Sequence, residues 1–281
     1  MPLLHIAILA LFQGVTEFLP ISSSAHLVLV PKFLCWQDQG LTIDVAVHVG
    51  TLGAIVLYLW RDLWDMTVAV LQVAKGRRNP NARMAGFIVL ATVPVIAAGL
   101  AVDHYFPNGI RNLTVIAWAT LGFGVLLWLT DKTGMTVRRM EHFRLSDAMI
   151  IGFAQVLALI PGTSRSGITM TAARMLGVER LDSARFSMLL SIPTIVGAGV
   201  LKGWDLYKSG NSTLTHEAFT AAGLSFGAAF VAVILMMAWL RRATFTPFVL
   251  YRVALGLFLL TVAYGWVDWN SLLGIVLDCA K

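Results

Sequence analysis

The chain has 281 residues, of which 58% are hydrophobic and only 13% are charged, and its formal net charge is +6. A soluble domain of average composition carries about 25% charged residues. This composition therefore excludes a soluble enzyme, a disordered chain and a secreted disulfide scaffold, and it predicts a polytopic membrane protein made of α-helices.

The chain begins with a short apolar run, residues 3–16, which ends at Glu17 and Pro20. A serine cluster follows, and then a second short apolar stretch at 27–36. Runs of this length suit a re-entrant or core segment better than a full membrane span. We therefore expect a re-entrant helical hairpin, whose broken backbone must be buried in protein or line a wet cavity. Three longer segments are then predicted to span the membrane: 41–60, 83–102 and 112–130.

The second half of the chain repeats this order. Residues 148–160 are apolar, are interrupted at Pro161, and are followed by a short apolar stretch at 168–176, which predicts a second hairpin. Three further spans are predicted at 184–203, 218–240 and 246–267. The expected fold is thus an all-α membrane protein of ten helices, with six transmembrane helices and two re-entrant hairpins, in a single domain over residues 1–281.

The two halves, about 1–130 and 146–270, are predicted to be inverted repeats. At the hairpin turns, Leu19-Pro20-Ile21-Ser22-Ser23-Ser24 aligns with Ile160-Pro161-Gly162-Thr163-Ser164-Arg165. Because an odd number of spans separates the hairpins, the second copy is inserted upside down, and the two hairpin tips are expected to meet inside the membrane. Broken helices at equivalent places in inverted repeats often mark the functional site of a membrane protein.

Basic residues are concentrated on one side of this predicted topology. Of the 21 Lys and Arg residues, 14 lie on this side. They are found in loops 61–83 and 131–147, after the second hairpin, and at Arg241-Arg242. Such a bias marks the cytoplasmic side, so we expect both termini outside and no nucleic-acid partner. A topology in which both hairpins cross the membrane fully also has an even number of crossings, so it stays open. The two cysteines, Cys35 and Cys279, predict neither a zinc site nor a disulfide.

Each hairpin turn carries one isolated charge. Glu17 is the only acid in residues 1–37, and Arg165 is the only charged residue between Asp147 and Arg174. An ionisable group inside a membrane costs about 2.5–3.5 kcal/mol on insertion scales, so such groups usually serve a function. Polar side chains surround both charges: Ser22, Ser23, Ser24 and His26 in the first turn, and Thr163, Ser164, Ser166 and Thr169 in the second.

This combination of side chains is typical of a phosphate site. A guanidinium binds phosphate oxygens in a bidentate manner, and hydroxyls and free backbone N–H groups at a helix start add donors. A carboxylate beside an anion is repulsive unless it holds a divalent cation or acts as a base, so Glu17 predicts a phosphate bridged by Mg²⁺ or Ca²⁺. Gln13 lies one helical turn before Glu17 and is a second candidate ligand. His26 lies at helical spacing from Ser22 and Ser23, where it could act as acid or base.

Each of these features also has a simpler explanation. Glu17 and Arg165 could only neutralise each other between packed hairpins, although a structural pair would not need the surrounding hydroxyls. The serines could only cap helices, although capping explains one serine per helix. His48 could equally be a hydrogen-bonded core residue or part of the site.

Two segments resemble the signatures of one family. The first segment resembles the first signature of the undecaprenyl-diphosphate phosphatases, the BacA/UppP family. It reads Gln13-Gly14-Val15-Thr16-Glu17-Phe18-Leu19-Pro20-Ile21-Ser22-Ser23-Ser24-Ala25-His26. Pro161-Gly162-Thr163-Ser164-Arg165-Ser166-Gly167 resembles their second, P-G-x-S-R-S-G. Tyr251-Arg252-Val253-Ala254-Leu255-Gly256 is similar to the pattern of the family's last span. The resemblance extends over essentially the whole chain.

The resemblance implies an enzyme of the bacterial inner membrane that removes the terminal phosphate of undecaprenyl diphosphate. That reaction recycles the lipid carrier for peptidoglycan synthesis, and overproduction in the family confers bacitracin resistance. A divalent cation and an active site open to the outer, periplasmic face are also implied. By position, Glu17 is the essential carboxylate, Ser23 the proposed nucleophile, His26 an acid or base and Arg165 the phosphate clamp. Attack by a water, with Glu17 or His26 as the base, is the alternative to attack by Ser23.

The remaining polar side chains of the turns are expected to bind the phosphate groups of the substrate. They are Ser22, Ser24, Thr163, Ser164, Ser166 and Thr169. Glu17 and Gln13 are expected to hold the cation. Gln13 stands where the family signature allows either an acid or glutamine, so the site has one carboxylate instead of two.

Two other classes of function compete with a phosphatase. A transporter or flippase of an isoprenyl phosphate is the main alternative, because inverted repeats with broken helices are also a transporter architecture. Anion transport needs the arginine, whereas bond cleavage also needs Glu17 and a nucleophile. A non-catalytic assembly partner is a third reading, which the polar tips argue against. Besides the lipid substrate and membrane lipids, a second copy of the chain could pair through small residues such as Gly223 and Gly227.

Overall fold

Eleven α-helices make up the computed structural model in the residues it describes, which are 2–34, 36, 40–105, 112–209 and 212–267. The helices are α1 (Leu3–Thr16), α2 (Ser23–Phe33), α3 (Gly40–Tyr58), α4 (Trp60–Ala74), α5 (Pro80–Tyr105), α6 (Leu113–Thr133), α7 (Leu145–Val156), α8 (Arg165–Met175), α9 (Arg180–Ser209), α10 (Ser212–Leu240) and α11 (Thr246–Ala263). Two 3-10 turns, η1 (Met140–His142) and η2 (Leu157–Leu159), complete these segments, which contain no strand. The predicted all-α class is confirmed. Cys35 and Cys279 lie outside the described residues.

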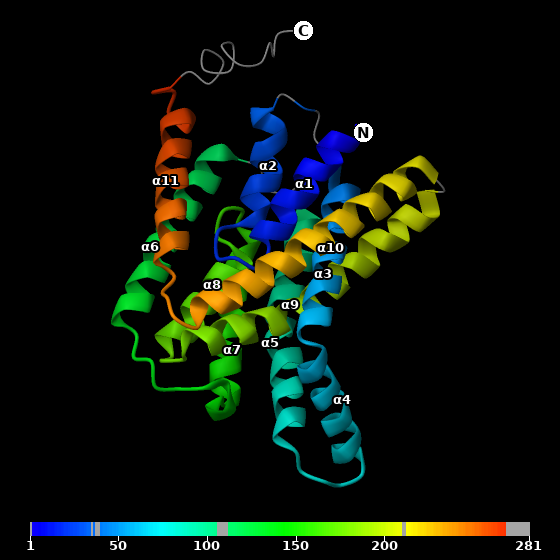
Figure 1. Cartoon of the computed structure of the whole chain (residues 1–281), viewed down its shortest axis with the longest axis vertical. Coiled ribbons are helices and arrows are strands. Elements are labelled where there is room, and N and C mark those ends of the chain that lie inside the picture. Colours follow the sequence, from blue (N-terminus) through cyan, green and yellow to red (C-terminus); the bar gives the residue numbers. More distant parts are fainter. Residues whose placement is uncertain (1, 35, 37–39, 106–111, 210–211, 268–281) are drawn as a thin grey trace.

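Two helical hairpins form where the short apolar runs predict them. In the first, α1 packs on α2, and in the second, α7 and η2 pack on α8. The turns contain Pro20 and Pro161. Proline has no N–H to continue a helix, and it disfavours helical backbone in the residue before it. Each short apolar pair is therefore broken in the middle and folds back on itself (Figure 1).

Each predicted span overlaps one long helix of the structure. Four of these helices, α5, α6, α10 and α11, are long and apolar enough to cross a membrane. The bent pair of α3 and α4 makes a fifth crossing if the two helices together count as one span. Helix α9 covers the predicted span 184–203, but it is not among these candidates in the part of the chain that the structure describes.

The prediction that residues 61–83 form a loop is wrong, and so is the total of ten helices. Residues Trp60–Ala74 form α4, which follows α3 after a bend of 76° and packs along α5. Arg61, Asp62 and Asp65 interrupt the apolar pattern here, so the helix carries no continuous hydrophobic signal. Its apolar residues instead lie at helical spacing, which is the pattern of an amphipathic helix.

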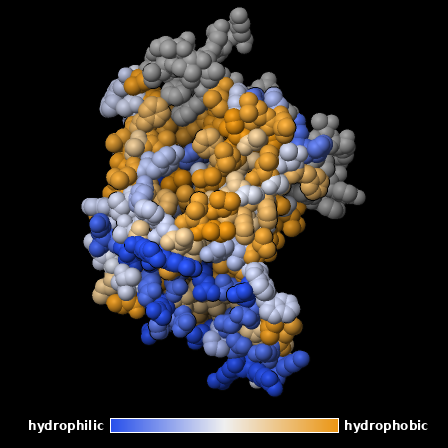
Figure 2. Space-filling model, in the orientation of Figure 1, coloured by the Kyte–Doolittle hydropathy of each residue, from blue (hydrophilic) through white to orange (hydrophobic). Residues whose placement is uncertain are grey.

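Large apolar side chains cover much of the surface. On α5, Val89, Val93, Ile96 and Leu100 are all about half exposed or more. Figure 2 shows hydrophobic residues over the upper part of one face and hydrophilic residues gathered over the lower part. Exposed apolar surface of this extent is unusual for a soluble monomer and is typical of a protein surrounded by lipid.

The first helix of each hairpin packs on a helix from the other half of the chain. Helix α1 packs on α10 of the second half, and α7 packs on α5 of the first half. Glycines make both contacts close, because a Cβ on Gly14 would lie 2.5 Å from Ala228 Cβ, and one on Gly152 would lie 2.4 Å from the carbonyl oxygen of Ala91. Helix α3 also packs on α9, and α6 on α11. The hairpin turns are thus enclosed by helices from both halves.

Charged loops gather at one end of the molecule. Helix α1 begins and α11 ends at the upper side in Figure 1, whereas the α4–α5 turn and the connection from α6 to α7 lie at the lower side. Exposed basic residues of those lower segments include Lys75, Arg77, Arg78, Arg139 and Arg144.

An ion pair ties the α6–α7 connection to the start of the second hairpin. Asp147 accepts hydrogen bonds from Arg138 Nη2 at 2.6 Å and from the backbone N–H of Arg144 at 2.8 Å. The hydrogen bond with Asp147 holds the pKa of Arg138 above its ordinary value. This contact holds the α6–α7 connection against the first turn of α7.

Candidate active site

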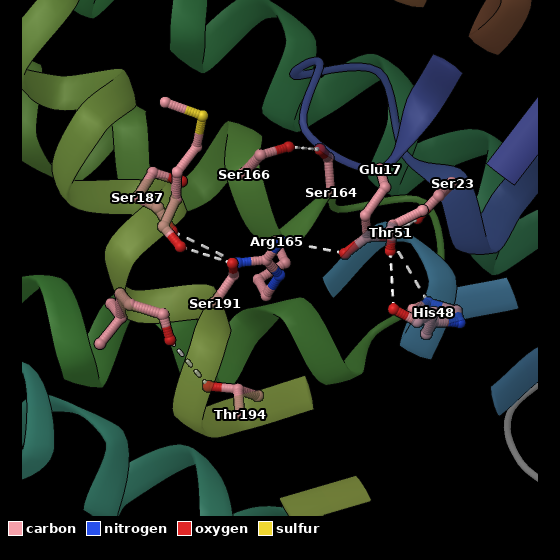
Figure 3. A network of polar contacts seen from close by, with 12 residues as sticks. Glu17, Ser23, His48, Thr51, Ser164, Arg165, Ser166, Ser187, Ser191 and Thr194 are labelled. Carbon is pink, nitrogen blue, oxygen red and sulfur yellow. Dashed lines mark hydrogen bonds and ion pairs between the residues drawn. The ribbon is translucent and has the colours of Figure 1, made fainter. Parts of the chain in front are cut away.

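Glu17 lies at the centre of the contact between the two hairpin turns. It directly follows α1, and only 5% of the residue is exposed. One carboxylate oxygen, Oε2, accepts hydrogen bonds from Gln13 Nε2 at 2.8 Å and from Ser23 Oγ at 2.7 Å. The other, Oε1, accepts one from Arg165 Nη2 at 2.9 Å (Figure 3). The two turns therefore lie in contact, as the sequence predicts, and their place within the membrane stays a prediction.

The two turns present Ser23 and Arg165 in the same way. Each is the first residue of its helix, and the residue before it, Ser22 or Ser164, has a positive φ of 73° or 70°. Ser22 Oγ lies 3.3 Å from Ser24 Oγ, and Ser164 Oγ lies 3.1 Å from Ser166 Oγ. The same backbone conformation thus places two different side chains on opposite oxygens of one carboxylate.

This equivalence corrects the register of the predicted repeat by one residue. The sequence alignment places Ser22 opposite Thr163, but the helix starts place it opposite Ser164. The second turn contains one residue more between its proline and the serine of positive φ, because Gly162 and Thr163 stand where the first turn has only Ile21, and an ungapped alignment cannot represent that difference.

Contacts between the tips hold Arg165 in place. Ser166 Oγ donates to the carbonyl oxygen of Leu19 at 2.8 Å, which joins the second turn to the first. The Arg165 guanidinium lies 6.0 Å from the centre of the Phe18 ring. Thr169 Oγ1 donates to the Arg165 carbonyl at 2.9 Å and lies 2.7 Å from Ser187 Oγ on α9.

The structure separates the two histidines that the sequence singles out. His26 Nδ1 lies 2.8 Å from the carbonyl oxygen of Ser22, and its Nε2 lies 2.5 Å from Tyr251 Oη. Because a carbonyl can only accept, Nδ1 carries the proton of the neutral ring. Both ring nitrogens of His26 are therefore engaged away from Glu17. His48 Nε2, by contrast, lies 3.5 Å from Glu17 Oε2.

His48 belongs to the site. Its Nδ1 lies 2.6 Å from the carbonyl oxygen of Asp44, one turn earlier in α3, and this contact aims Nε2 at the carboxylate. Its side chain is 30% exposed, so the Glu17 carboxylate can be approached from this side. The sequence left His48 open between core and site because a histidine in an apolar span has no pattern that distinguishes the two.

The other predicted phosphate ligands lie around the tips without touching Glu17. Ser22, Ser24, Ser164, Ser166 and Thr169 make the contacts described above, which lie mainly within their own turns. Thr163 is fully buried, and its hydroxyl has no hydrogen-bond partner among the described residues. Phosphate binding by these hydroxyls stays a prediction.

One buried residue beside the tips had no expected role. Arg252 on α11 is fully buried, and its guanidinium donates to carbonyl oxygens in both turns. The available signal was the same as for Arg165, namely a lone charge in an apolar segment.

The arrangement supplies the groups that phosphoryl transfer needs. The Ser23 hydroxyl donates to a carboxylate at 2.7 Å, which is the geometry of a nucleophile beside its base. Arg165 brings a positive charge to the same place, where it can stabilise negative charge on a phosphoryl group.

Comparison with known proteins agrees with this chemistry. The family model described as bacitracin resistance protein BacA matches residues 6–258. The chain is similar to undecaprenyl-diphosphatase 1 of Rhodospirillum rubrum, with 53% identity over 271 residues that cover 94% of this chain and 96% of the relative. It is 49% identical over 267 residues to the undecaprenyl-diphosphatase of Ruegeria pomeroyi, covering 94% of this chain and 100% of the relative. With the corresponding protein of Hahella chejuensis it shares 47% identity over 262 residues, which cover 93% and 98% of the two chains.

Proposed function

Because the chain belongs to the family of the bacitracin resistance protein BacA, we infer that it is an undecaprenyl-diphosphate phosphatase. It is a membrane hydrolase that releases the terminal phosphate of the lipid diphosphate and so recycles the carrier for cell-wall synthesis. The observation that carries its chemistry is the contact of Ser23 and Arg165 with opposite oxygens of Glu17.

We propose that Ser23 attacks the terminal phosphorus. As Ser23 Oγ bonds to phosphorus, its proton moves to Glu17 Oε2, and the bond from phosphorus to the bridging oxygen breaks. The isoprenyl monophosphate leaves with the electron pair of that bond. Water then attacks the phosphoserine, inorganic phosphate departs, and Ser23 Oγ regains its proton from Glu17. The 2.7 Å contact favours Glu17 over His26 as the base, since both nitrogens of His26 are engaged elsewhere.

Arg165 binds the diphosphate in this proposal. Its Nη2 holds Glu17, and its Nη1 makes only a long contact, 3.4 Å, to the Ser187 carbonyl. The guanidinium can therefore turn its weaker edge toward a phosphate oxygen. Charge stabilisation by a fixed donor of this kind typically contributes about 10²–10³-fold to the rate.

The residues at the tip fit a divalent cation. The Oε1 atom of Gln13 is buried and has no partner among the described residues, beside the Glu17 carboxylate to which the same amide donates. Carboxylate and amide oxygens suit Mg²⁺ or Ca²⁺. The described part of the chain has no cluster of three or more His, Cys, Asp or Glu residues, so water molecules and phosphate oxygens would complete the coordination. A cation held there by Gln13 and Glu17 would neutralise charge on the phosphate groups.

We also propose that the helices form six spans and two re-entrant hairpins in two inverted repeats. The packing supports this arrangement, because α1 on α10 corresponds to α7 on α5 under the repeat, and α3–α9 and α6–α11 correspond to themselves. Gly14 and Gly152, which permit the α1–α10 and α7–α5 contacts, lie on corresponding helices.

The distribution of charge supports an orientation in the bacterial inner membrane with the basic loops in the cytoplasm. Lys75, Arg77, Arg78 and Arg139 lie at the end of the molecule opposite to the start of α1 and the end of α11. By the positive-inside rule we propose that both termini face the periplasm, and that the active site opens to the same side. A homodimer stays a prediction; Gly223 and Gly227 have open space around them.

Phosphate release from undecaprenyl diphosphate by the purified protein tests this function. We expect kcat to fall at least about 10²-fold in each of three variants. Glu17→Gln removes the base, Ser23→Ala removes the nucleophile, and Arg165→Gln removes the positive charge. The Tm of each variant shows whether it is folded. Arg78→Gln, in the exposed α4–α5 turn, is the control and should keep wild-type activity.

Two further outcomes separate the alternatives. A chelator should stop phosphate release by the folded wild type. Activity near the wild-type level in both Glu17→Gln and Arg165→Gln would contradict the proposed site, and transport of the lipid without phosphate release would favour the transporter.

A further inference from the structure

Arg252 is a buried cation whose neighbours are all neutral. The residue is fully buried, and no carboxylate in the described part of the chain lies within ion-pair distance of it. Its guanidinium donates to five carbonyl oxygens at 2.9–3.4 Å, those of Ala119, Thr120, Pro20, Gly162 and Thr163. A buried charge without a counter-ion is costly, so its retention needs a reason.

Three of those carbonyls belong to the two catalytic turns. Pro20 lies midway between Glu17 and Ser23, and Gly162 and Thr163 directly precede the strained Ser164. One rigid guanidinium thus binds both turns at once, and the fork of donors in arginine suits this better than a lysine would. Gly167 on α8 makes room for it, because a Cβ there would lie 2.7 Å from Arg252 Nη1.

The neighbouring Tyr251 holds the first turn by a second route. Its hydroxyl donates to His26 Nε2 at 2.5 Å, and His26 Nδ1 in turn donates to the Ser22 carbonyl at 2.8 Å. Ser22 has a positive φ and immediately precedes Ser23. Tyr251 therefore restrains the residue that sets the direction of the proposed nucleophile.

From these contacts we propose that Tyr251 and Arg252 are positioning residues that hold the two turns in register, and that the diphosphate of the substrate is the counter-ion of Arg252. The proposal rests on the phosphatase function. Glu17 neutralises one of the two arginines at the tips, Arg165 and Arg252, so the tips keep one excess positive charge. A diphosphate supplies the opposite charge without a direct contact to Arg252.

Two substitutions of Arg252 separate its charge from its hydrogen bonds. Arg252→Lys keeps the charge but cannot bind both turns, so kcat should fall by about 10²-fold, as a misplacement of about 1 Å can cause, while KM stays near the wild-type value. Arg252→Gln loses both, so KM should rise as kcat falls. Tyr251→Phe should lower kcat less, with KM unchanged.

Arg174→Gln is the matched control. Arg174 is also fully buried and donates to the carbonyl oxygens of Val178 and Gly134, but it pairs with Asp131 and lies near the other end of α8, about 14 Å from Arg165 along the helix. Its loss should lower the Tm and leave kcat and KM of the folded protein unchanged. Equal kinetic losses in Arg174→Gln and Arg252→Gln would overturn the proposal.

Binding of inorganic pyrophosphate gives a readout that does not depend on turnover. It should raise the Tm of the wild type and of Arg252→Lys more than that of Arg252→Gln, which keeps Arg165 but has lost the excess charge. Wild-type kinetics and a wild-type shift in Arg252→Gln would refute the inference. If the wild type itself released no phosphate, the phosphatase function would fail instead, and the Tm shifts would still decide the role of Arg252. Should Arg252→Gln not fold, Arg252→Lys and Tyr251→Phe carry the kinetic test.

Discussion

Two serines, Ser22 and Ser164, hold the backbone of the hairpin turns in a conformation that residues with a side chain rarely adopt. Such conformations cost about 1–3 kcal/mol each and persist where surrounding contacts require them. Here they direct the first residues of α2 and α8, Ser23 and Arg165, to the same carboxylate. Strain in the turns is therefore coupled to the geometry of the site.

Ser22→Gly tests this coupling. Glycine adopts a positive φ freely, so we expect the free energy of unfolding to rise by about 1 kcal/mol while kcat falls, because the turn loses its restraint on Ser23. Thermal unfolding and phosphate release measure the two effects. Ser24→Gly is the control: it removes the partner hydroxyl from inside α2 and should lower stability by about 1 kcal/mol. A lower Tm in both variants would show that Ser22 is not strained.

Glu17 and Arg165 could be predicted from the sequence because each is an isolated charge in an apolar stretch. The same signal was present for Arg252, but its partners are backbone carbonyls of separate segments, and no side-chain pattern indicates them. His48 was undecided for a related reason, because its neighbour Glu17 lies 31 residues away and only the fold brings them together.

At the scale of elements, the hairpins were predictable and α4 was not. The hairpin runs are too short for a span and contain Pro20 or Pro161, so length and composition agree. In α4, charges interrupt the apolar pattern. The chain bends by 76° between α3 and α4, and no proline at that point of the sequence indicates the bend. Its helical spacing of apolar residues was the signal that a search for continuous hydrophobic runs misses.

Gly152→Ala tests the contact of α7 with α5. The added Cβ would lie 2.4 Å from the Ala91 carbonyl oxygen, and both atoms belong to packed helices. We expect a loss of about 1–3 kcal/mol in stability from overpacking, measured as a lower Tm in detergent. Gly223→Ala, with open space around it on α10, should be neutral or stabilising. Equal Tm values for the two variants would contradict the close contact.

At the scale of the whole molecule, the separation of charged loops from apolar surface predicts the orientation in the membrane. After replacement of both natural cysteines by serine, Arg78→Cys should react with a membrane-impermeant thiol reagent only from the cytoplasmic side, and His104→Cys only from the periplasmic side. Labelling of intact cells and of inverted vesicles measures this. The reverse pattern would contradict the orientation, and labelling of both from one side would contradict the span of α5.

The packing of each hairpin on the other half of the chain limits how the molecule can move. In a transporter that works by rocking, one half turns as a rigid body against the other. Here such a rotation would pull α1 away from α10 and α7 away from α5. In both contacts the helices approach each other closely at a glycine. Packing across the halves therefore resists such a rotation, and we expect the distances from Glu17 to Ser23 and to Arg165 to change little when a substrate binds.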